Sequence, residues 1–352
     1  MNPDRPTSEP RDPERTGTTL PGGPALDRTG TAPPPPGPGA LGGLHTRLTD
    51  WFAAQARDLP WREPGCSAWG ILVSEVMLQQ TPVVRVLPVW HEWLRRWPSP
   101  AHLAADSPGE AVRHWGRLGY PRRALRLHAA ATAVVEDHGG AVPSTHGELL
   151  SLPGVGDYTA AAVAAFAFGR RETVVDTNIR RVHARLFGGK ALPAPALTSA
   201  EMKRAAELLP EDAALSVRWN AAVMELGAVV CTARTPSCAV CPVSDACAWV
   251  AAGRPAPEYV PKGQSWAGTD RQVRGAIVAV LREAEQPVPR AVLLEAPVDL
   301  SVGGPPGSPP VLTALTTLHA LRAPGEQLER ALAGLLADGL AAETDGGVRL
   351  PV

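Results

Sequence analysis

The sequence lacks the features of membrane and secreted proteins. It contains no apolar run near the roughly 20 residues that a membrane-spanning helix needs. Its first residues do not show the basic and then apolar pattern of a secretory signal. It has only five cysteines, an odd number, and four of them lie close together, which favours metal or cluster binding over disulfides. We therefore expect a cytoplasmic, nucleoid-associated protein without a membrane partner.

An excess of positive charge is also missing. The 34 lysines and arginines are balanced by 35 aspartates and glutamates, and the formal net charge is −1. Net charge therefore gives no support for a nucleic-acid partner, and any DNA-binding face has to be local. Hydrophobic residues make up 44% of the 352 residues, which allows a sizeable core and, by length, about two domains plus tails.

Composition divides the chain into four parts. Residues 1–40 are rich in proline, glycine, threonine and charge, and are predicted to be a disordered tail. In residues 41–250 apolar side chains recur at three- and four-residue steps between short proline or glycine breaks, which predicts an all-α domain of many short helices. Residues 251–268 are polar and are expected to be a linker. Residues 269–352 differ in character and form a separate module.

The pattern of this last part predicts a small winged-helix-like α+β module. Helices are expected from about 269 to 283, where threonine and aspartate can cap the start, and over about 325–338. A proline- and glycine-rich insertion lies near 303–310. Segments 341–344 and 348–350 flank Asp-Gly-Gly, which is a hairpin signal.

Four cysteines form the strongest motif in the chain. They are Cys231, Cys238, Cys241 and Cys247, in the pattern Cys-x6-Cys-x2-Cys-x5-Cys. Four thiolates so close in sequence can bind a tetrahedral zinc ion or a cubane iron–sulfur cluster. Spacing alone leaves the metal open. The fifth, Cys66, is expected to be a small core residue.

The segment Leu-Pro-Gly-Val-Gly, at 152–156, lies between two helical stretches. Gly154 and Gly156 allow a tight turn and expose backbone N–H groups at the start of the next helix. Together with the helix dipole, these groups can hold a DNA phosphate without reading base sequence. Two glycines by themselves would also fit a plain turn.

These motifs together resemble the endonuclease III, or helix–hairpin–helix, superfamily of DNA glycosylases, and in particular its MutY-type adenine DNA glycosylases. Ser-Glu-Val-Met-Leu-Gln-Gln-Thr, at 74–81, is similar to the MutY-type signature over its whole length. Val-Asp-Thr-Asn, at 175–178, resembles the catalytic aspartate segment. The resemblance covers roughly residues 45–250. It implies a bilobal, mainly all-α fold with the active site between its halves and a [4Fe–4S] cluster in the 231–247 loop.

The resemblance assigns the chemistry to two carboxyl groups. Breaking the bond between adenine and its sugar requires a proton on the leaving base and stabilisation of an oxocarbenium-like sugar, and the base must first leave the duplex stack. Glu75 is implied to protonate adenine N7 and then to handle the attacking water. Asp176, supported by Asn178, is implied to stabilise the cationic sugar by its charge or through a covalent adduct.

Tyr158 stands where endonuclease III-like enzymes carry the lysine that forms a Schiff base with the sugar. A tyrosine cannot do this, so the enzyme is expected to be monofunctional, without strong strand cleavage.

Further residues match the family by motif. Those expected to wall the adenine pocket are Arg57, Trp61 and Leu78. Those expected to read the opposite base are Gln80, Thr81, Leu118 and Tyr120. Gln80 and Tyr120 resemble wedge residues that enter the base stack, where an aromatic ring can replace lost stacking. Arginines near the motifs could supply a local positive face, and these are Arg117, Arg122, Arg123, Arg126, Arg180, Arg181 and Arg185.

The C-terminal part departs from the family pattern. Typical MutY-type proteins end in a NUDIX-like domain that inspects 8-oxoguanine with a Phe-Ser-His loop, whereas 269–352 is too short and lacks this loop. It resembles the short ending of actinobacterial forms. Pro121 replaces a frequent second tyrosine, and Ala221 follows Asn220 where Glu or Gln is frequent.

The sequence therefore predicts a monomeric base excision repair hydrolase that removes adenine opposite 8-oxoguanine or guanine in double-stranded DNA. Two alternatives remain open at this point. One is a thymine or uracil glycosylase for G:T and G:U mismatches, which the Glu75 motif argues against. The other is a non-catalytic DNA-binding protein with a cluster.

Overall fold

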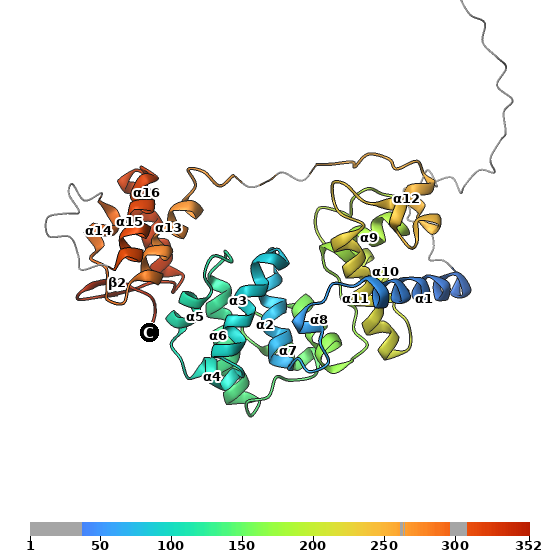
Figure 1. Ribbon diagram of the computed structural model, residues 1–352, viewed down its shortest axis with the longest axis horizontal. Helices are drawn as coiled ribbons and strands as arrows, with labels where there is room; N and C mark the ends of the chain where they lie inside the picture. Colours follow the sequence, from blue (N-terminus) through green and yellow to red (C-terminus); the bar gives the residue numbers. More distant parts are fainter. Residues whose placement is uncertain (1–36, 261–262, 264, 296–307) are drawn as a thin grey trace, which may run out of the picture.

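The computed structural model describes residues 37–260, 263, 265–295 and 308–352, and helices form nearly all of their regular structure (Figure 1). The helices fall into two lobes and a C-terminal module. The first lobe consists of a short 3-10 turn and the helices that follow it. These elements are η1 (Pro60–Arg62), α2 (Ala68–Leu78), α3 (Val83–Arg96), α4 (Pro100–Ala104), α5 (Pro108–His114), α6 (Arg122–Asp137), α7 (His146–Ser151) and α8 (Asp157–Phe168).

The second lobe combines the first helix of the chain with the helices that follow α8. Its elements are α1 (Pro38–Gln55), α9 (Thr177–Leu186), α10 (Ser199–Leu208), α11 (Ala213–Val229), η2 (Cys238–Val240), η3 (Ser244–Ala246) and α12 (Ala248–Ala251). Helix α1 packs on α11, so the N-terminal helix closes the lobe that also carries the cysteines. The start of α1 at Pro38 lies inside the predicted tail of residues 1–40, whose residues 1–36 lie outside the described part of the chain.

Helix α8 lies at the boundary between the lobes. It consists almost wholly of small or apolar residues, so it can be buried on both sides. Ala160 and Val163 belong to the apolar core of the first lobe, whereas Ala161, Ala162 and Ala165 belong to that of the second. The helix ends at a left-handed glycine, which is the common way to end a helix. The residues that open α8 are thereby placed between the lobes.

The described residues of the C-terminal module form four helices and a hairpin. These are α13 (Asp270–Glu283), α14 (Arg290–Leu294), α15 (Pro309–Ala320), α16 (Gly325–Ala337), β1 (Ala342–Thr344) and β2 (Gly347–Arg349). The strands are antiparallel, with Glu343 opposite Val348. The described residues between α12 and α13 form no helix or strand.

The predicted fold class, a bilobal helical domain followed by a small α+β module, is confirmed. One detail of the module was wrong. Pro309 and Pro310, assigned to the insertion at 303–310, instead open α15, because proline suits the first turn of a helix. Residues 303–307 of that predicted insertion lie outside the described residues. Among the helices that the structure describes, none is long and apolar enough to cross a membrane.

Candidate active site and cluster loop

Glu75 carries a buried carboxyl group and belongs to a helix, α2, whose other side chains are mostly apolar. Helix α2 is buried along most of its length, and Glu75 is only 6% exposed. Its Oε2 accepts a hydrogen bond of 2.9 Å from the Tyr158 hydroxyl. Burial raises the pKa of Glu75 to about 7, and the charge of Asp176 adds to this, against the opposing effects of Tyr158 and Arg62. A substantial fraction of Glu75 therefore carries a proton at neutral pH.

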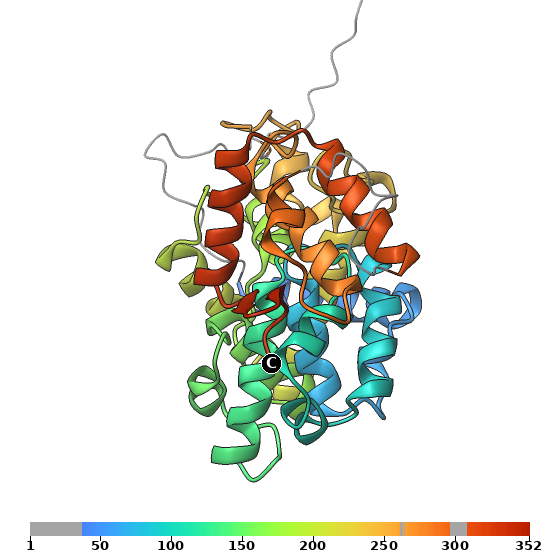
Figure 2. The same ribbon diagram turned by 90° about the vertical axis from the view of Figure 1, so that its left-hand side faces the viewer.

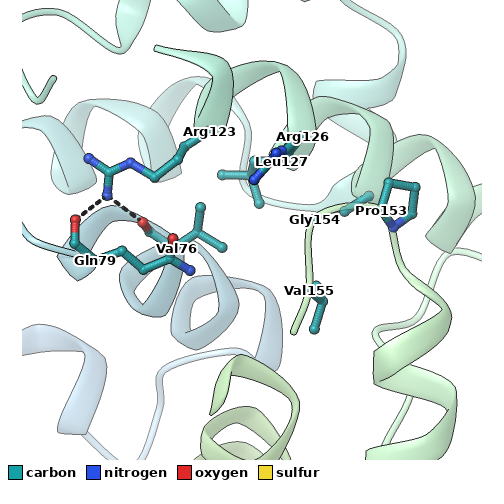
Figure 3. Close-up of a pocket in the computed structure, with 9 residues that line it drawn as sticks. Val76, Gln79, Arg123, Arg126, Leu127, Pro153, Gly154 and Val155 are labelled. Atoms are coloured by element: carbon teal, nitrogen blue, oxygen red, sulfur yellow. Dashed lines mark hydrogen bonds between the residues drawn. The ribbon is translucent and has the colours of Figure 1, made fainter. Parts of the chain in front are cut away.

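Tyr158 reaches Glu75 from the first turn of α8. Burial, with the nearby charges of Glu75 and Asp176, raises the pKa of Tyr158 well above its usual range, so its hydroxyl keeps the proton that it donates. The hairpin before α8 sets where this helix begins. Gly154 has a φ of +78°, and a Cβ there would lie 2.6 Å from the Cβ of Arg126, so only glycine fits (Figure 3). At Gly156, the N-cap of α8, a Cβ would meet nothing within 4 Å.

Asp176 is held rigidly at the start of α9. As N-cap residue, it accepts a 2.6 Å hydrogen bond at Oδ1 from the backbone N–H of Ile179. Its Oδ2 accepts a second bond of 2.7 Å from the Asn178 side chain. Burial raises the pKa of Asp176, and these two hydrogen bonds, with the charge of Arg181, oppose the rise. The residue is therefore both a helix cap and a fixed carboxyl group.

The two carboxyl groups come from different lobes and meet beside Tyr158. Glu75 belongs to α2 of the first lobe, Asp176 precedes α9 of the second, and Tyr158 opens the helix between them. Two neighbouring carboxyl groups with different surroundings can hold different protonation states. In the part of the chain that the structure describes, a backbone N–H donates to Asp176 but none donates to Glu75, which favours the proton on Glu75.

Arg57, one of the residues predicted to wall the adenine pocket, binds a buried carboxylate that the sequence motifs did not indicate. Glu225 of α11 is fully buried and accepts hydrogen bonds from Arg57 Nε and Nη2, both 2.7 Å, and from Arg62 Nη2, 2.8 Å. Burial opposes ionisation of Glu225, but these bonds outweigh it and lower its pKa to about 2. A lone acidic residue within the apolar run Ala-Val-Met-Glu-Leu-Gly-Ala-Val was the available signal.

The other two predicted wall residues lie in the first lobe. Trp61 is 7% exposed and packs edge-to-face on Trp90, with the ring centroids 5.7 Å apart. Leu78 is half-buried at the end of α2 and packs against the same core.

The two predicted wedge residues are exposed and held in an unfavourable backbone conformation. Gln80 and Tyr120 have φ values of +55° and +47°, in the left-handed region that costs about 1–2 kcal/mol for a residue other than glycine. Arg123 stabilises both turns, donating from Nη1 to the carbonyl of Gln79 at 2.6 Å and from Nη2 to that of Gly119 at 3.2 Å. Figure 3 shows its guanidinium at the end of α2. The backbones of both turns, from which the two exposed side chains project, are thus held by one buried cation.

Thr81 and Leu118 lie inside the fold instead. Both are buried, and the Thr81 hydroxyl donates to the carbonyl of Leu118 at 3.2 Å. The Thr81 hydroxyl and the Leu118 backbone carbonyl thus join the two wedge turns, whereas the expectation was that these two residues read the opposite base.

Some of the arginines predicted to form a positive face are engaged within the protein. Arg123 and Arg185 are buried, Arg180 pairs with Glu201, and Arg181 donates to the carbonyl of Cys231. The forked guanidinium satisfies several buried carbonyl groups at once, which explains its use there. The arginines of the set with exposed positions are Arg117, Arg122 and Arg126, and of these Arg122 pairs with Asp338.

Two of the four clustered cysteines, Cys231 and Cys247, contact the end of α9. Arg185 Nη1 lies 3.4 Å from the sulfur of Cys231, and the Cys247 sulfur lies 3.5 Å from the carbonyl of Arg185. Burial raises the pKa of Cys241 to about 11, and the charges of the other three thiolates contribute. Thiolates this close repel one another unless a cation lies among them. The donor set therefore fits a bound cluster of iron, for which cysteine thiolates are the usual ligands.

The comparisons with known proteins agree with this fold and these groups. Residues 73–207 match the HhH-GPD superfamily of base excision DNA repair proteins, and residues 231–247 match the iron–sulfur binding domain of endonuclease III. A solved thermostable thymine-DNA glycosylase is similar, with a TM-score of 0.54 and 29% identity over 59% of this chain and 95% of that one. Fold and site thus define a base excision repair DNA glycosylase that binds a [4Fe–4S] cluster and DNA.

Two curated relatives specify the family. The adenine DNA glycosylase of Mycobacterium tuberculosis is 47% identical over 321 residues, covering 90% of this chain and 97% of the relative. That of Mycolicibacterium smegmatis is 52% identical over 246 residues, covering 70% and 83%. The chain belongs to the adenine DNA glycosylase family. The predictions of a base excision repair N-glycosylase that acts on adenine, and of its iron–sulfur cofactor, are confirmed.

Proposed function

We propose that this chain is a monofunctional glycosylase that works as a monomer on nucleoid DNA in the cytoplasm and removes adenine opposite 8-oxoguanine or guanine. The contact that carries this proposal is the 2.9 Å hydrogen bond between Tyr158 and the buried, proton-retaining Glu75, with Asp176 close enough to raise the pKa of Glu75. This arrangement supplies an acid, a carboxylate and a neutral hydroxyl, and no amine.

The reaction begins with the flipped adenine between the lobes. Glu75 transfers its proton to N7 of adenine, the C1′–N9 bond breaks, and its electron pair leaves with the base. The sugar becomes an oxocarbenium ion, which faces the carboxylate of Asp176. Water then attacks C1′ and gives its proton to Glu75, which restores the acid and leaves an abasic sugar.

The neighbouring side chains keep Glu75 and Asp176 in the positions and protonation states that the reaction needs. The Asn178 side chain donates a hydrogen bond to one oxygen of Asp176 and thereby fixes the orientation of that carboxylate. Tyr158 donates to Glu75 and, because it has no amine, cannot form the Schiff base that leads to strand cleavage. The cluster, when bound, supplies a structural cross-link between Cys231, Cys238, Cys241 and Cys247.

The DNA contacts follow from exposure and geometry. Gln80 and Tyr120 project from strained turns and would enter the stack beside the opposite base, with Thr81 and Leu118 holding those turns. Backbone N–H groups of the hairpin at Gly154 and Gly156 would hold a phosphate at the start of α8. Further residues would wall the adenine pocket, and they are Arg57, Trp61 and Leu78.

Base excision from defined duplexes tests this function. Adenine, thymine or uracil is placed opposite 8-oxoguanine or guanine, and products are scored with and without heat and alkali. We expect product only from adenine-containing duplexes, with strand breakage that requires alkali. Product from thymine or uracil opposite guanine, with adenine untouched, would overturn this proposal in favour of a glycosylase for G:T and G:U mismatches. The chain would then act on the same base as the solved thymine-DNA glycosylase that it resembles.

A further inference from the structure

The C-terminal module has the outline of a winged helix, a fold that often binds DNA, but its charges are already used within the protein. Its hairpin carries the acidic residues Glu343 and Asp345, which would repel a phosphate backbone. Several of its arginines bind groups of this chain, namely Arg274, Arg282, Arg290 and Arg330. These charges do not favour phosphate binding by the module, and its contacts with the first lobe indicate a different role.

The module is docked on α5 of the first lobe (Figures 1 and 2). Arg113 of α5 donates to the backbone carbonyls of Arg282 and Ala284 at the end of α13. In return, Arg282 Nε donates to the carbonyl of Val112 at 2.9 Å. These exchanged bonds satisfy carbonyl groups at two helix ends, which otherwise lack partners.

The module and α5 also meet at Gly109, where there is no room for a side chain larger than that of glycine. A Cβ at Gly109 of α5 would lie 2.2 Å from the carbonyl oxygen of Pro351, near the end of the chain. The backbones are therefore in direct contact there, and the apolar core of the first lobe continues into the module. Such a close, continuous contact is rigid.

The module also holds the start of α6. Asp338, which follows α16, accepts from Arg274 inside the module and pairs with Arg122 of α6 at 3.2 Å. Arg122 comes two residues after Tyr120, whereas Arg113 precedes the same loop from the other side. The loop of residues 115–121, which carries Tyr120, is thus fixed at both ends by one module.

We propose that the C-terminal module is a brace that positions Tyr120 through Arg113 and Asp338, and so sets selectivity for the base opposite adenine. This inference rests on the proposed function, in which Tyr120 reads that base. Arg113 and Asp338 are positioning residues, since neither touches the reacting atoms. The brace adds to the support that Arg123 gives to the strained Tyr120 backbone from within the first lobe.

The test compares excision of adenine opposite 8-oxoguanine with excision opposite an abasic analogue, under single-turnover conditions, in the full-length protein. The brace variants are Arg113→Ala and Asp338→Asn. Each has a control in the same module: Arg330→Ala removes an ion pair to Asp270, and Asp345→Asn removes a charge at the exposed hairpin tip. The thermal midpoint and the iron–sulfur absorbance show that each variant is folded.

We expect the brace variants to lose about three- to tenfold in excision opposite 8-oxoguanine, as for about 1 kcal/mol of lost interaction, and to keep the rate opposite the abasic analogue. The controls should keep both rates. An equal fall on both substrates, or an unchanged ratio in folded brace variants, would overturn the brace. If the wild-type protein itself does not prefer 8-oxoguanine over the abasic analogue, the proposed function fails, whatever the variants do.

Discussion

Replacing Glu75 with glutamine should make the protein inactive and, above neutral pH, more stable. Glu75 titrates at about 7 in the folded protein, against an ordinary value of 4.5, chiefly because it is buried. The folded state therefore binds this proton more tightly than the unfolded state does. The contribution of Glu75 to the free energy of unfolding therefore falls as the pH rises from 4.5 to about 7, and it stays low at higher pH.

The magnitude follows from the difference between the two pKa values. At about 1.4 kcal/mol for each tenfold change in proton affinity, ionised Glu75 lowers the free energy of unfolding by about 3 kcal/mol above pH 7. Glutamine resembles the protonated acid, and its amide oxygen can still accept the hydrogen bond of the Tyr158 hydroxyl. Glu75→Gln should recover most of that free energy near pH 8 and almost none near pH 5.

Thermal unfolding at these two pH values, together with single-turnover excision, measures both effects. Glu136→Gln, a change of the same kind at an exposed position of α6, is the control and should alter neither quantity. In the wild-type protein, excision should decline as pH rises through about 7, because the acid loses its proton. A folded Glu75→Gln protein that is less stable than wild type near pH 8 would refute the argument from burial.

Three further changes test other parts of the site. Asp176→Asn should lower excision by about a hundredfold or more while DNA binding persists, because the cationic sugar loses its carboxylate; unchanged excision would remove Asp176 from the mechanism. Glu225→Gln should lower the free energy of unfolding by about 1–2 kcal/mol, measured by denaturant titration, because the partly exposed guanidinium groups of Arg57 and Arg62 lose their buried charge partner. Cys238→Ser should lose the broad absorbance near ~400 nm and lower the thermal midpoint, whereas Cys66→Ser should keep both; retained absorbance in Cys238→Ser would contradict its role as a ligand.

Features set by neighbours in sequence could be predicted from the sequence alone. The cysteine spacing, the hairpin glycines and the cap of α13 each depend on residues a few positions apart, and the helical periodicity depends on one or two turns. The iron–sulfur binding segment matched its predicted bounds, 231–247. The resemblance that gave the family also rests on such short, contiguous motifs.

Long-range contacts decided the rest. Glu225 lies 168 residues from Arg57, so the apolar run around Glu225 could indicate its burial but not the arginines that keep it ionised. Arg123 was expected on a DNA-binding face but is buried, because it satisfies carbonyl groups at the end of α2. The docking of the module on α5 likewise depends on contacts such as that of Arg113 with Ala284, 171 residues away.

The protonation of Glu75 shows the division most clearly. The sequence determined that a carboxyl group stands in this motif, and hence what chemistry it can perform. Only the tertiary structure decided that Tyr158, 83 residues away, and the charge of Asp176 would lie beside it in a site largely shielded from solvent. A pKa depends on the solvent and charges around the group, and those come from segments that only folding brings together.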